Sequence, residues 1–253
     1  MIATTDDELK NLRTAGRILA EILRDLSAMA KPGISSAALD LAAEEMIRAR
    51  GAVPAFLNYR PRGAAYAFPA ALCVSINDEV VHGIPTEQKI LKAGDLVMLD
   101  CGLSYNGFFS DAAVTLCVGK CDEKAERLVA AVREGLRAAV AAARVGNRLG
   151  DIGAAVEAVA KKYDYAVAED LGGHGIGRVP HEKPYIANTG VPGKGEKLVE
   201  GMVLALEPIF TEGSGEIVLA EDEWTYRTAD HSRSAEFEHT VLITAKGAEI
   251  LTA

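Results

Sequence analysis

Four acidic residues lie within or beside apolar runs that are typical of buried β-strands. Asp100 and Asp111 belong to the first half of the chain, and Glu207 and Glu238 belong to the second half. A carboxylate that leaves water needs a proton, an ion partner or a metal cation. Four carboxylates that point into the interior therefore predict bound cations.

The dipeptide Asn106-Gly107 between the two aspartates predicts a two-residue hairpin turn. A type I′ turn there would pair residue 105 with 108, and therefore 100 with 113. Because 111 and 113 share a face, Asp100 and Asp111 would be diagonal neighbours, with backbones about 7 to 8 Å apart. The alternative from this segment alone is a pair of solvated aspartates at strand ends.

Three of the five histidines lie in segments that we predict to be turns, because glycine and proline surround them. They are His82 before Gly83, His174 within 172–177, and His181 after Pro180. An alternative function of this glycine-rich stretch is to bind a phosphate group. A nucleotide-binding loop is followed directly by a helix, however, whereas Arg-Val-Pro-His follows this stretch. We expect the glycines to let His174 approach a site closely.

Four carboxylates and one imidazole form an oxygen-rich ligand set: Asp100, Asp111, His174, Glu207 and Glu238. This set suits manganese, iron(II), cobalt or zinc, and it differs from the thiolate sites of structural zinc. Because the set contains enough carboxylates to bridge two ions, we predict two divalent metals about 3.5 to 4 Å apart. The sequence leaves the identity of these metals undetermined. The expected reaction class is hydrolysis of an acyl or phosphoryl bond. We interpret the other two histidines, His231 and His239, as ordinary polar residues, with His239 on the face opposite Glu238.

The elements that must position these residues follow from hydrophobic periodicity. Amphipathic helices are predicted after Thr5 until Lys31, after Ser35 until Gly51, at about 122–143 and at about 149–162. Strand-like runs occupy 70–77, 95–103, 108–118, 202–210, 215–220, 223–228 and 236–244. Because the order helix, helix, strands occurs twice, we expect one α+β domain over residues 1–253, built from two similar halves.

Composition excludes several classes of protein. The 253 residues carry 36 Asp and Glu against 27 Lys and Arg, a formal net charge of −9, which argues against nucleic-acid binding. No apolar run reaches the roughly 20 residues of a membrane span, and the acidic N-terminus is unlike a signal peptide. We therefore expect a cytoplasmic protein without membrane contact. The four cysteines (Cys73, Cys101, Cys117 and Cys121) form no CxxC pair and are expected to be reduced, buried thiols.

In their joint order and spacing, these segments resemble the type I methionine aminopeptidases, which remove the initiator methionine from new proteins. The likeness covers nearly the whole chain, including FPAALCVSINDEVVHGIP, GDLVMLDCGL, FFSDAAVTL, GGHGIGRVPHEKP, GMVLALEPIF and EFEHT. The resemblance implies a pita-bread fold of two pseudo-symmetric halves, with a curved, mainly antiparallel sheet covered by helices and no N-terminal extension. It also implies that the metal ligands are the same five residues.

The resemblance further implies the roles of individual side chains. Glu207 would shuttle the proton of the attacking water to the leaving nitrogen, His181 would polarise the carbonyl oxygen, and His82 would hold the next amide nitrogen. The methionine pocket maps onto Tyr59, Phe68, Cys73 and Trp224, where Phe68 replaces a frequent tyrosine. By the same analogy, backbone carbonyls near Asn77, Glu79 and Ser234 would bind a monovalent cation. We expect a monomeric enzyme whose partners are the N-termini of nascent polypeptides. A transient contact with the ribosome stays an open alternative.

Two departures bear on the selection of methionine. The segment 60–67 is longer than the family's usual link, and Pro180 stands where some members place an aromatic pocket residue. Two alternative functions also stay open. An Xaa-Pro aminopeptidase or dipeptidase has the same fold and ligands but usually carries an additional N-terminal domain. A non-catalytic module of this fold that binds peptides typically loses metal ligands.

Overall fold

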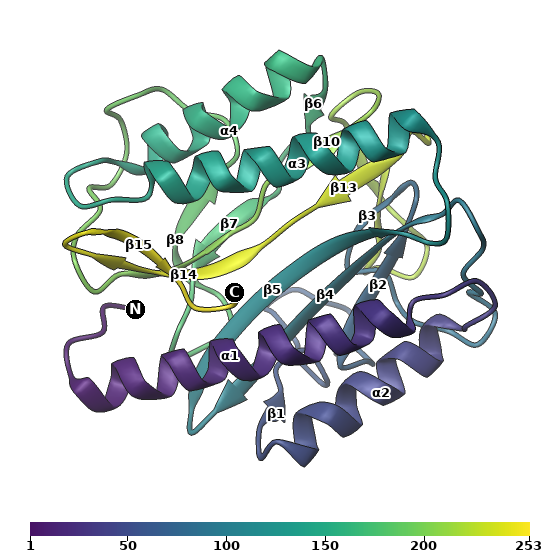
Figure 1. Ribbon diagram of the computed structural model, residues 1–253, viewed down its shortest axis with the longest axis horizontal. Helices are drawn as coiled ribbons and strands as arrows, with labels where there is room; N and C mark the ends of the chain where they lie inside the picture. Colours follow the sequence, from purple (N-terminus) through teal and green to yellow (C-terminus); the bar gives the residue numbers. More distant parts are fainter.

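Two pairs of α-helices flank the strands of this computed structural model, which describes residues 1–253 (Figure 1). Helices α1 (Asp6–Met29) and α2 (Ser36–Ala49) belong to the first half, and α3 (Glu123–Ala142) and α4 (Leu149–Tyr163) to the second. All four predicted helices are therefore confirmed. The first begins with a capping box, because the Thr5 hydroxyl accepts from the Glu8 N–H and the Glu8 carboxylate accepts from the Thr5 N–H.

The first half builds a four-stranded antiparallel sheet around one long hairpin. Its strands are β1 (Val53–Pro54), β2 (Leu72–Ile76), β4 (Leu96–Tyr105) and β5 (Phe108–Cys117). Tyr105 pairs with Phe108, so the predicted hairpin register is confirmed. The turn residues Asn106 and Gly107 have φ values of 51° and 78°, as a type I′ turn requires.

The second half builds a five-stranded antiparallel sheet in the order β15-β14-β9-β7-β8. These strands are β7 (Gly172–Gly175), β8 (Glu182–Ala187), β9 (Val203–Leu206), β14 (His239–Thr244) and β15 (Gly247–Ile250). Two small sheets complete the fold, β13-β10-β6 and β11-β12-β3. Their strands are β3 (Glu79–Val81), β6 (Ala166–Val167), β10 (Ile209–Thr211), β11 (Ile217–Leu219), β12 (Tyr226–Thr228) and β13 (Ser234–Glu236).

The prediction of a turn around His174 is wrong, because this residue lies in β7, paired with β8 on one side and β9 on the other. The flanking glycines have a packing reason. A Cβ on Gly173 would overlap the carbonyl oxygen of Ala205, and one on Gly175 would overlap that of Lys183. Glycine in this strand therefore permits a close approach of neighbouring backbones.

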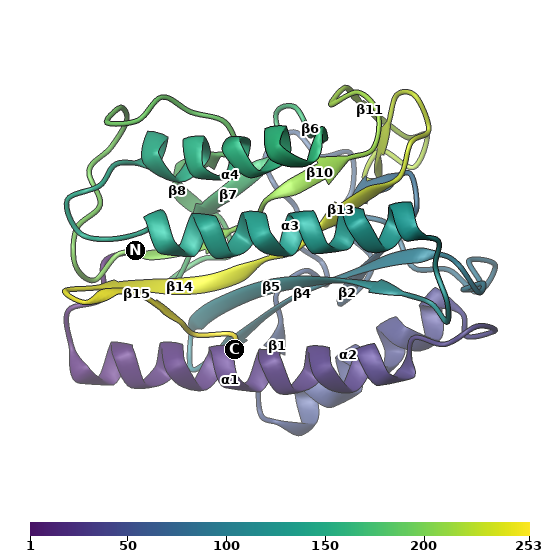
Figure 2. The same ribbon diagram turned by 45° about the horizontal axis from the view of Figure 1, so that its top comes forward.

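The helix pairs lie on opposite outer sides of the strands, and each pair covers a core of its own (Figures 1 and 2). Leu19, Ile22 and Leu26 of α1 pack in one cluster with Val97 and Leu99 of β4. A second cluster joins buried residues of α3 and α4 to those of β9 and β14: Leu128, Val132, Val156, Leu204, Leu206 and Val241. Each such side chain contributes about 1.5 to 3 kcal/mol of transfer free energy. No helix has the length and apolar character needed to cross a membrane.

Candidate functional site

The two halves meet where β5 runs beside the segment 236–240, and two threonine hydroxyls hold them together. The hydroxyl of Thr115 donates to the carbonyl oxygen of Glu236 at 2.6 Å and accepts from its N–H at 2.9 Å. The hydroxyl of Thr240 makes the same two contacts with Asp111, at 2.7 and 2.9 Å. This reciprocal arrangement sets the backbone positions of Asp111, Glu236 and Glu238, so that their side chains converge.

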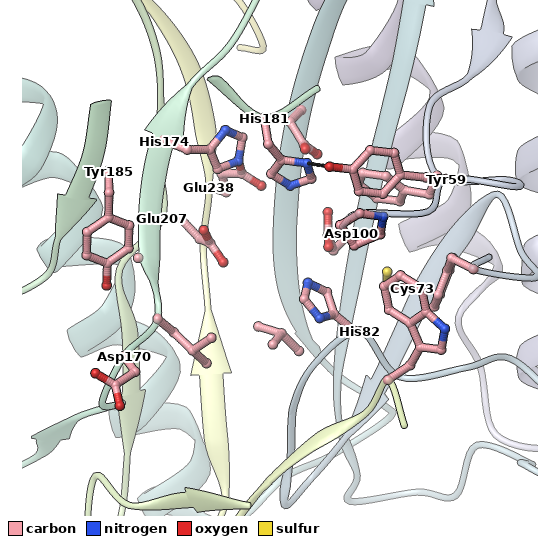
Figure 3. A pocket seen from close by; sticks show the side chains of 18 residues that line it. Tyr59, Cys73, His82, Asp100, Asp170, His174, His181, Tyr185, Glu207 and Glu238 are labelled. Carbon is pink, nitrogen blue, oxygen red and sulfur yellow. Dashed lines mark hydrogen bonds between the residues drawn. The ribbon is translucent and has the colours of Figure 1, made fainter. Parts of the chain in front are cut away.

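A cavity of about 370 Å³ opens between the halves. It is lined by every residue that the sequence analysis assigned to the divalent metals, the catalytic groups or the methionine pocket: Tyr59, Phe68, Cys73, His82, Asp100, Asp111, His174, His181, Glu207, Trp224 and Glu238. In Figure 3, His174, Glu207 and Glu238 lie to one side of its centre, and Tyr59, Cys73 and Asp100 lie to the other. The fold therefore brings these eleven residues together, whereas Asn77, Glu79 and Ser234 do not line the cavity.

The carboxylates crowd closely enough to share a cation. Asp100, Asp111 and Glu238 each place an oxygen within 4.8 Å of the other two, and Asp111, His174 and His181 form a second such group. Loss of solvation raises the pKa of Asp100 to about 7. It also raises the pKa values of Asp111 and Glu238 well above the ordinary values of these groups. Mutual repulsion adds to the effect at Asp111 and Glu238.

The unsatisfied atoms of this cluster provide a test of whether a metal would fit. Asp100 Oδ1, Asp111 Oδ1 and Glu238 Oε1 are buried and have no hydrogen-bond partner. Carboxylate oxygens in such a position are costly unless an ion pairs with them. Divalent cations bind carboxylate oxygens, so the residues present fit a metal centre.

Sequence reasoning missed Glu236, a buried carboxylate that interacts electrostatically with Asp100 and Glu207. It is only 1% exposed, and its Oε2 atom has no hydrogen-bond partner. Burial, followed by the charge of Asp100, raises the pKa of Glu236 to about 8. The sequence contains the pattern that would have identified Glu236. Glu236 and Glu238 are two residues apart in the same strand-like run, so both are carboxylates within an apolar run.

The histidines reach the cavity from three different elements. His174 comes from β7, His181 directly precedes β8, and their ring centroids are 4.5 Å apart. His82 follows β3 in a segment that is neither helix nor strand, and its φ is 57°. Loss of solvation lowers the pKa of His82 and of His174 to about 4, which keeps both rings neutral at pH 7. His239 points elsewhere and contacts the Thr252 hydroxyl through Nδ1 at 2.9 Å, as its assignment to the opposite face requires.

One end of the cavity is apolar and aromatic. The rings of Phe68 and Trp224 meet edge to face at 5.2 Å, and both pack in one cluster with Cys73 and Phe56. The longer segment 60–67 takes part, because Tyr66 meets the edge of Trp224 at 6.3 Å. Pro61 of this segment lines the cavity, and sequence reasoning did not identify the remaining lining residues, which are Phe56, Val81, Asp170, Leu171, Gly172 and Tyr185. Pro180 is not part of the lining.

All four cysteines are free; Cys117 is only half-buried, and the other three are buried as predicted.

Comparison with known proteins agrees with this geometry. A model of metallopeptidase family M24 matches residues 10–245. Methionine aminopeptidase 1 from Mycobacterium tuberculosis is 45% identical over 251 residues, which cover 97% of this chain and 92% of the relative. The crystal structure of methionine aminopeptidase from Rickettsia prowazekii matches with a TM-score of 0.95 and 38% identity over 100% of both chains. A prolidase from Pyrococcus furiosus, with a TM-score of 0.76 and 24% identity over 65% of its length, shares the fold alone.

The chain therefore belongs to metallopeptidase family M24, whose members are metal-dependent hydrolases. Within that family it belongs with the methionine aminopeptidases, which match it over nearly the full length of both proteins. The predicted pita-bread α+β fold is confirmed by the same structures. The Xaa-Pro alternative is not favoured, because the prolidase likeness extends only to the fold.

Proposed function

We propose that this protein removes the N-terminal methionine from nascent proteins and peptides, with a preference for a small second residue. The observation that carries this proposal is the union of two features in one cavity. A cluster of carboxylates with unpaired oxygens lies beside an apolar pocket of aromatic rings and a thiol. The first suits hydrolysis and the second suits a flexible thioether side chain.

Five side chains are proposed to hold two divalent ions: Asp100, Asp111, His174, Glu207 and Glu238. The ions would be cobalt, manganese, iron or zinc, and cellular supply would decide among them. When bound, such a pair supplies an activated water and stabilises negative charge on the reacting oxygens. The buried oxygens of Asp100, Asp111 and Glu238 without partners support this assignment.

The remaining polar groups handle protons and orientation. The Glu207 carboxylate accepts a proton from the attacking water and returns it to the leaving nitrogen. His181 donates a hydrogen bond from Nε2 to the carbonyl oxygen of the first residue. His82 is neutral, since its pKa is lowered to about 4, so a ring nitrogen can accept the next amide N–H.

The methionine side chain occupies the apolar end of the cavity. It contacts the rings of Tyr59, Phe68 and Trp224 and the thiol of Cys73. Burial, with the nearby charges of Asp100 and Asp111, raises the pKa of the Cys73 thiol well above its usual range. Cys73 therefore stays uncharged at neutral pH and is a compatible wall for a thioether.

The expected setting is that of an enzyme acting on new chains. We propose a monomer that works in the cytoplasm on emerging N-termini, with or without a transient ribosome contact. A monovalent cation near Asn77, Glu79 and Ser234 stays a prediction. In the protein, the N–H of Ser234 already donates to the Asn77 carbonyl at 2.9 Å, and its hydroxyl donates to that of Glu79 at 3.1 Å.

A peptide panel tests the proposed function. Metal-loaded protein should release methionine from Met-Ala-Ser, leave Ala-Pro-Ala intact, and lose activity when a chelator is added. Cleavage of the proline peptide alone would make the protein an Xaa-Pro aminopeptidase. If the metal-loaded protein binds both peptides and cleaves neither, the non-catalytic module is the correct interpretation.

A further inference from the structure

A tyrosine and a histidine that are far apart in the sequence share a hydrogen bond on the cavity wall. The Tyr59 hydroxyl oxygen lies 3.1 Å from Nδ1 of His181, and Figure 3 draws this contact as a dashed line. The two rings also pack against each other, with centroids 5.2 Å apart and planes inclined by 33°. The tyrosine hydroxyl has no other hydrogen-bond partner in the protein.

Both residues are held by their own backbone surroundings, so the contact is preorganised. The Tyr59 N–H donates to the carbonyl of Phe56 and its carbonyl accepts from the N–H of Phe68, each at 2.8 Å. On the other side, the Glu182 carboxylate accepts from the N–H groups of Arg178 and Val179, at 2.7 and 3.2 Å. The turn that carries His181 is therefore closed independently of Tyr59.

A neutral imidazole carries its single proton on one nitrogen, and the partner of that ring decides which one. With the proton on Nδ1, the Nε2 lone pair is free to bind a metal. With the proton on Nε2, the same atom is a hydrogen-bond donor. The distinction matters here, because a ring nitrogen of His181 lies within 4.8 Å of ligand atoms of Asp111 and His174.

We propose that Tyr59 is a positioning residue that donates its hydroxyl proton to Nδ1 of His181 and holds the ring in the Nε2–H tautomer. His181 is then a donor toward the carbonyl oxygen of the substrate and is prevented from joining Asp111 and His174 as a metal ligand. The donor role rests on the proposed function, whereas the tautomer is a property of the protein itself. Loss of solvation raises the pKa of Tyr59, which agrees with a hydroxyl that keeps its proton and donates it.

The variant Tyr59→Phe tests this proposal, because it removes the hydroxyl and keeps the ring that contacts methionine. In metal-free wild-type protein, ¹H–¹⁵N spectra that correlate ring protons with ring nitrogens should show His181 as the Nε2–H tautomer, and Tyr59→Phe should shift it toward Nδ1–H. The signal is assigned with His181→Gln. With Met-Ala-Ser, kcat of the loaded variant should fall about tenfold while KM changes less than about twofold.

A double-mutant cycle separates an action through His181 from a direct action on the substrate. In a His181→Ala background, Tyr59→Phe should have no further effect on kcat. Tyr165→Phe is the matched control, because Tyr165 packs against Tyr163 in the second half of the chain and does not line the cavity. It should leave kcat, KM and the His181 spectrum unchanged.

Two results would overturn the proposal. One is an Nδ1–H tautomer in the wild type, or a tautomer that Tyr59→Phe does not change. The other is a loss of kcat of the same size in the His181→Ala background. Failure of the wild type to cleave Met-Ala-Ser would instead contradict the proposed function, and the tautomer could still be measured in the metal-free protein.

Discussion

Glu236 provides a sharp test of the electrostatics of the cavity, because Glu236→Gln removes the charge and keeps the shape. In the metal-free protein, burial raises the pKa of this carboxyl from 4.5 to about 8. Between those values the folded chain binds a proton that the unfolded chain lacks. Stability must therefore fall as the pH rises through this range, by about 1.4 kcal/mol per pH unit for one proton.

The useful window lies between pH 6.5 and pH 8. Below it, histidines of the unfolded chain gain protons, and the lowered pKa of His82 and His174, about 4, then opposes the effect of Glu236. Within it, the Glu236 carboxyl changes from almost fully protonated to half ionised, which corresponds to a loss of roughly 1 to 2 kcal/mol. Asp100, whose pKa is about 7, contributes a smaller loss of stability, because its carboxyl has given up most of its proton above that pH.

Urea unfolding of chelator-treated protein at the two pH values measures this difference. Wild type should lose more stability than Glu236→Gln between pH 6.5 and pH 8, by an amount on the order of 1 to 2 kcal/mol. Glu126→Gln, a change at an exposed glutamate of α3, should behave as the wild type. An equal pH dependence in wild type and Glu236→Gln would refute the reasoning. With excess divalent metal, stability should instead rise with pH, because metal binding releases protons from the carboxyls.

Two further predictions concern the reaction and its selectivity. Glu207→Gln should fold normally by circular dichroism and lose about 10²- to 10⁴-fold in turnover of Met-Ala-Ser, the usual size of a general acid–base contribution; near-normal turnover would remove Glu207 from the proton pathway. Deletion of residues 61–66 removes Pro61 from the cavity wall and Tyr66 from the edge of Trp224, so the preference among methionine, norleucine and leucine at the first position should change. An unchanged preference would show that this segment has no part in selection.

Features that depend on neighbours in the sequence were predicted well. The hairpin at Asn106-Gly107 needs only two residues that accept positive φ, so its register, and with it the pairing of Asp100 with Ala113, followed from the sequence. The start of α1 is equally local, because Thr5 and Glu8 form the whole capping box. In both cases the interacting groups lie within a few residues of each other.

Features that depend on distant neighbours were missed. The segment around His174 has the composition of a turn, and it becomes a strand because the backbones of Ala205 and Lys183 approach its glycines. The contact of Tyr59 with His181 joins residues 122 positions apart, and no local pattern indicates it. Sequence analysis assigned Tyr59 to the methionine pocket alone.

The sequence by itself determined which residues could bind cations, because carboxylates inside apolar runs are costly wherever the chain places them. It also determined the helices and the hairpin that carry Asp100 and Asp111. Only the tertiary structure decided that Glu236 and Glu238 meet these aspartates, since the meeting depends on hydrogen bonds of Thr115 and Thr240 across the junction of the two halves. These contacts join residues that are 121 and 129 positions apart, and their geometry is therefore absent from any local pattern of residues.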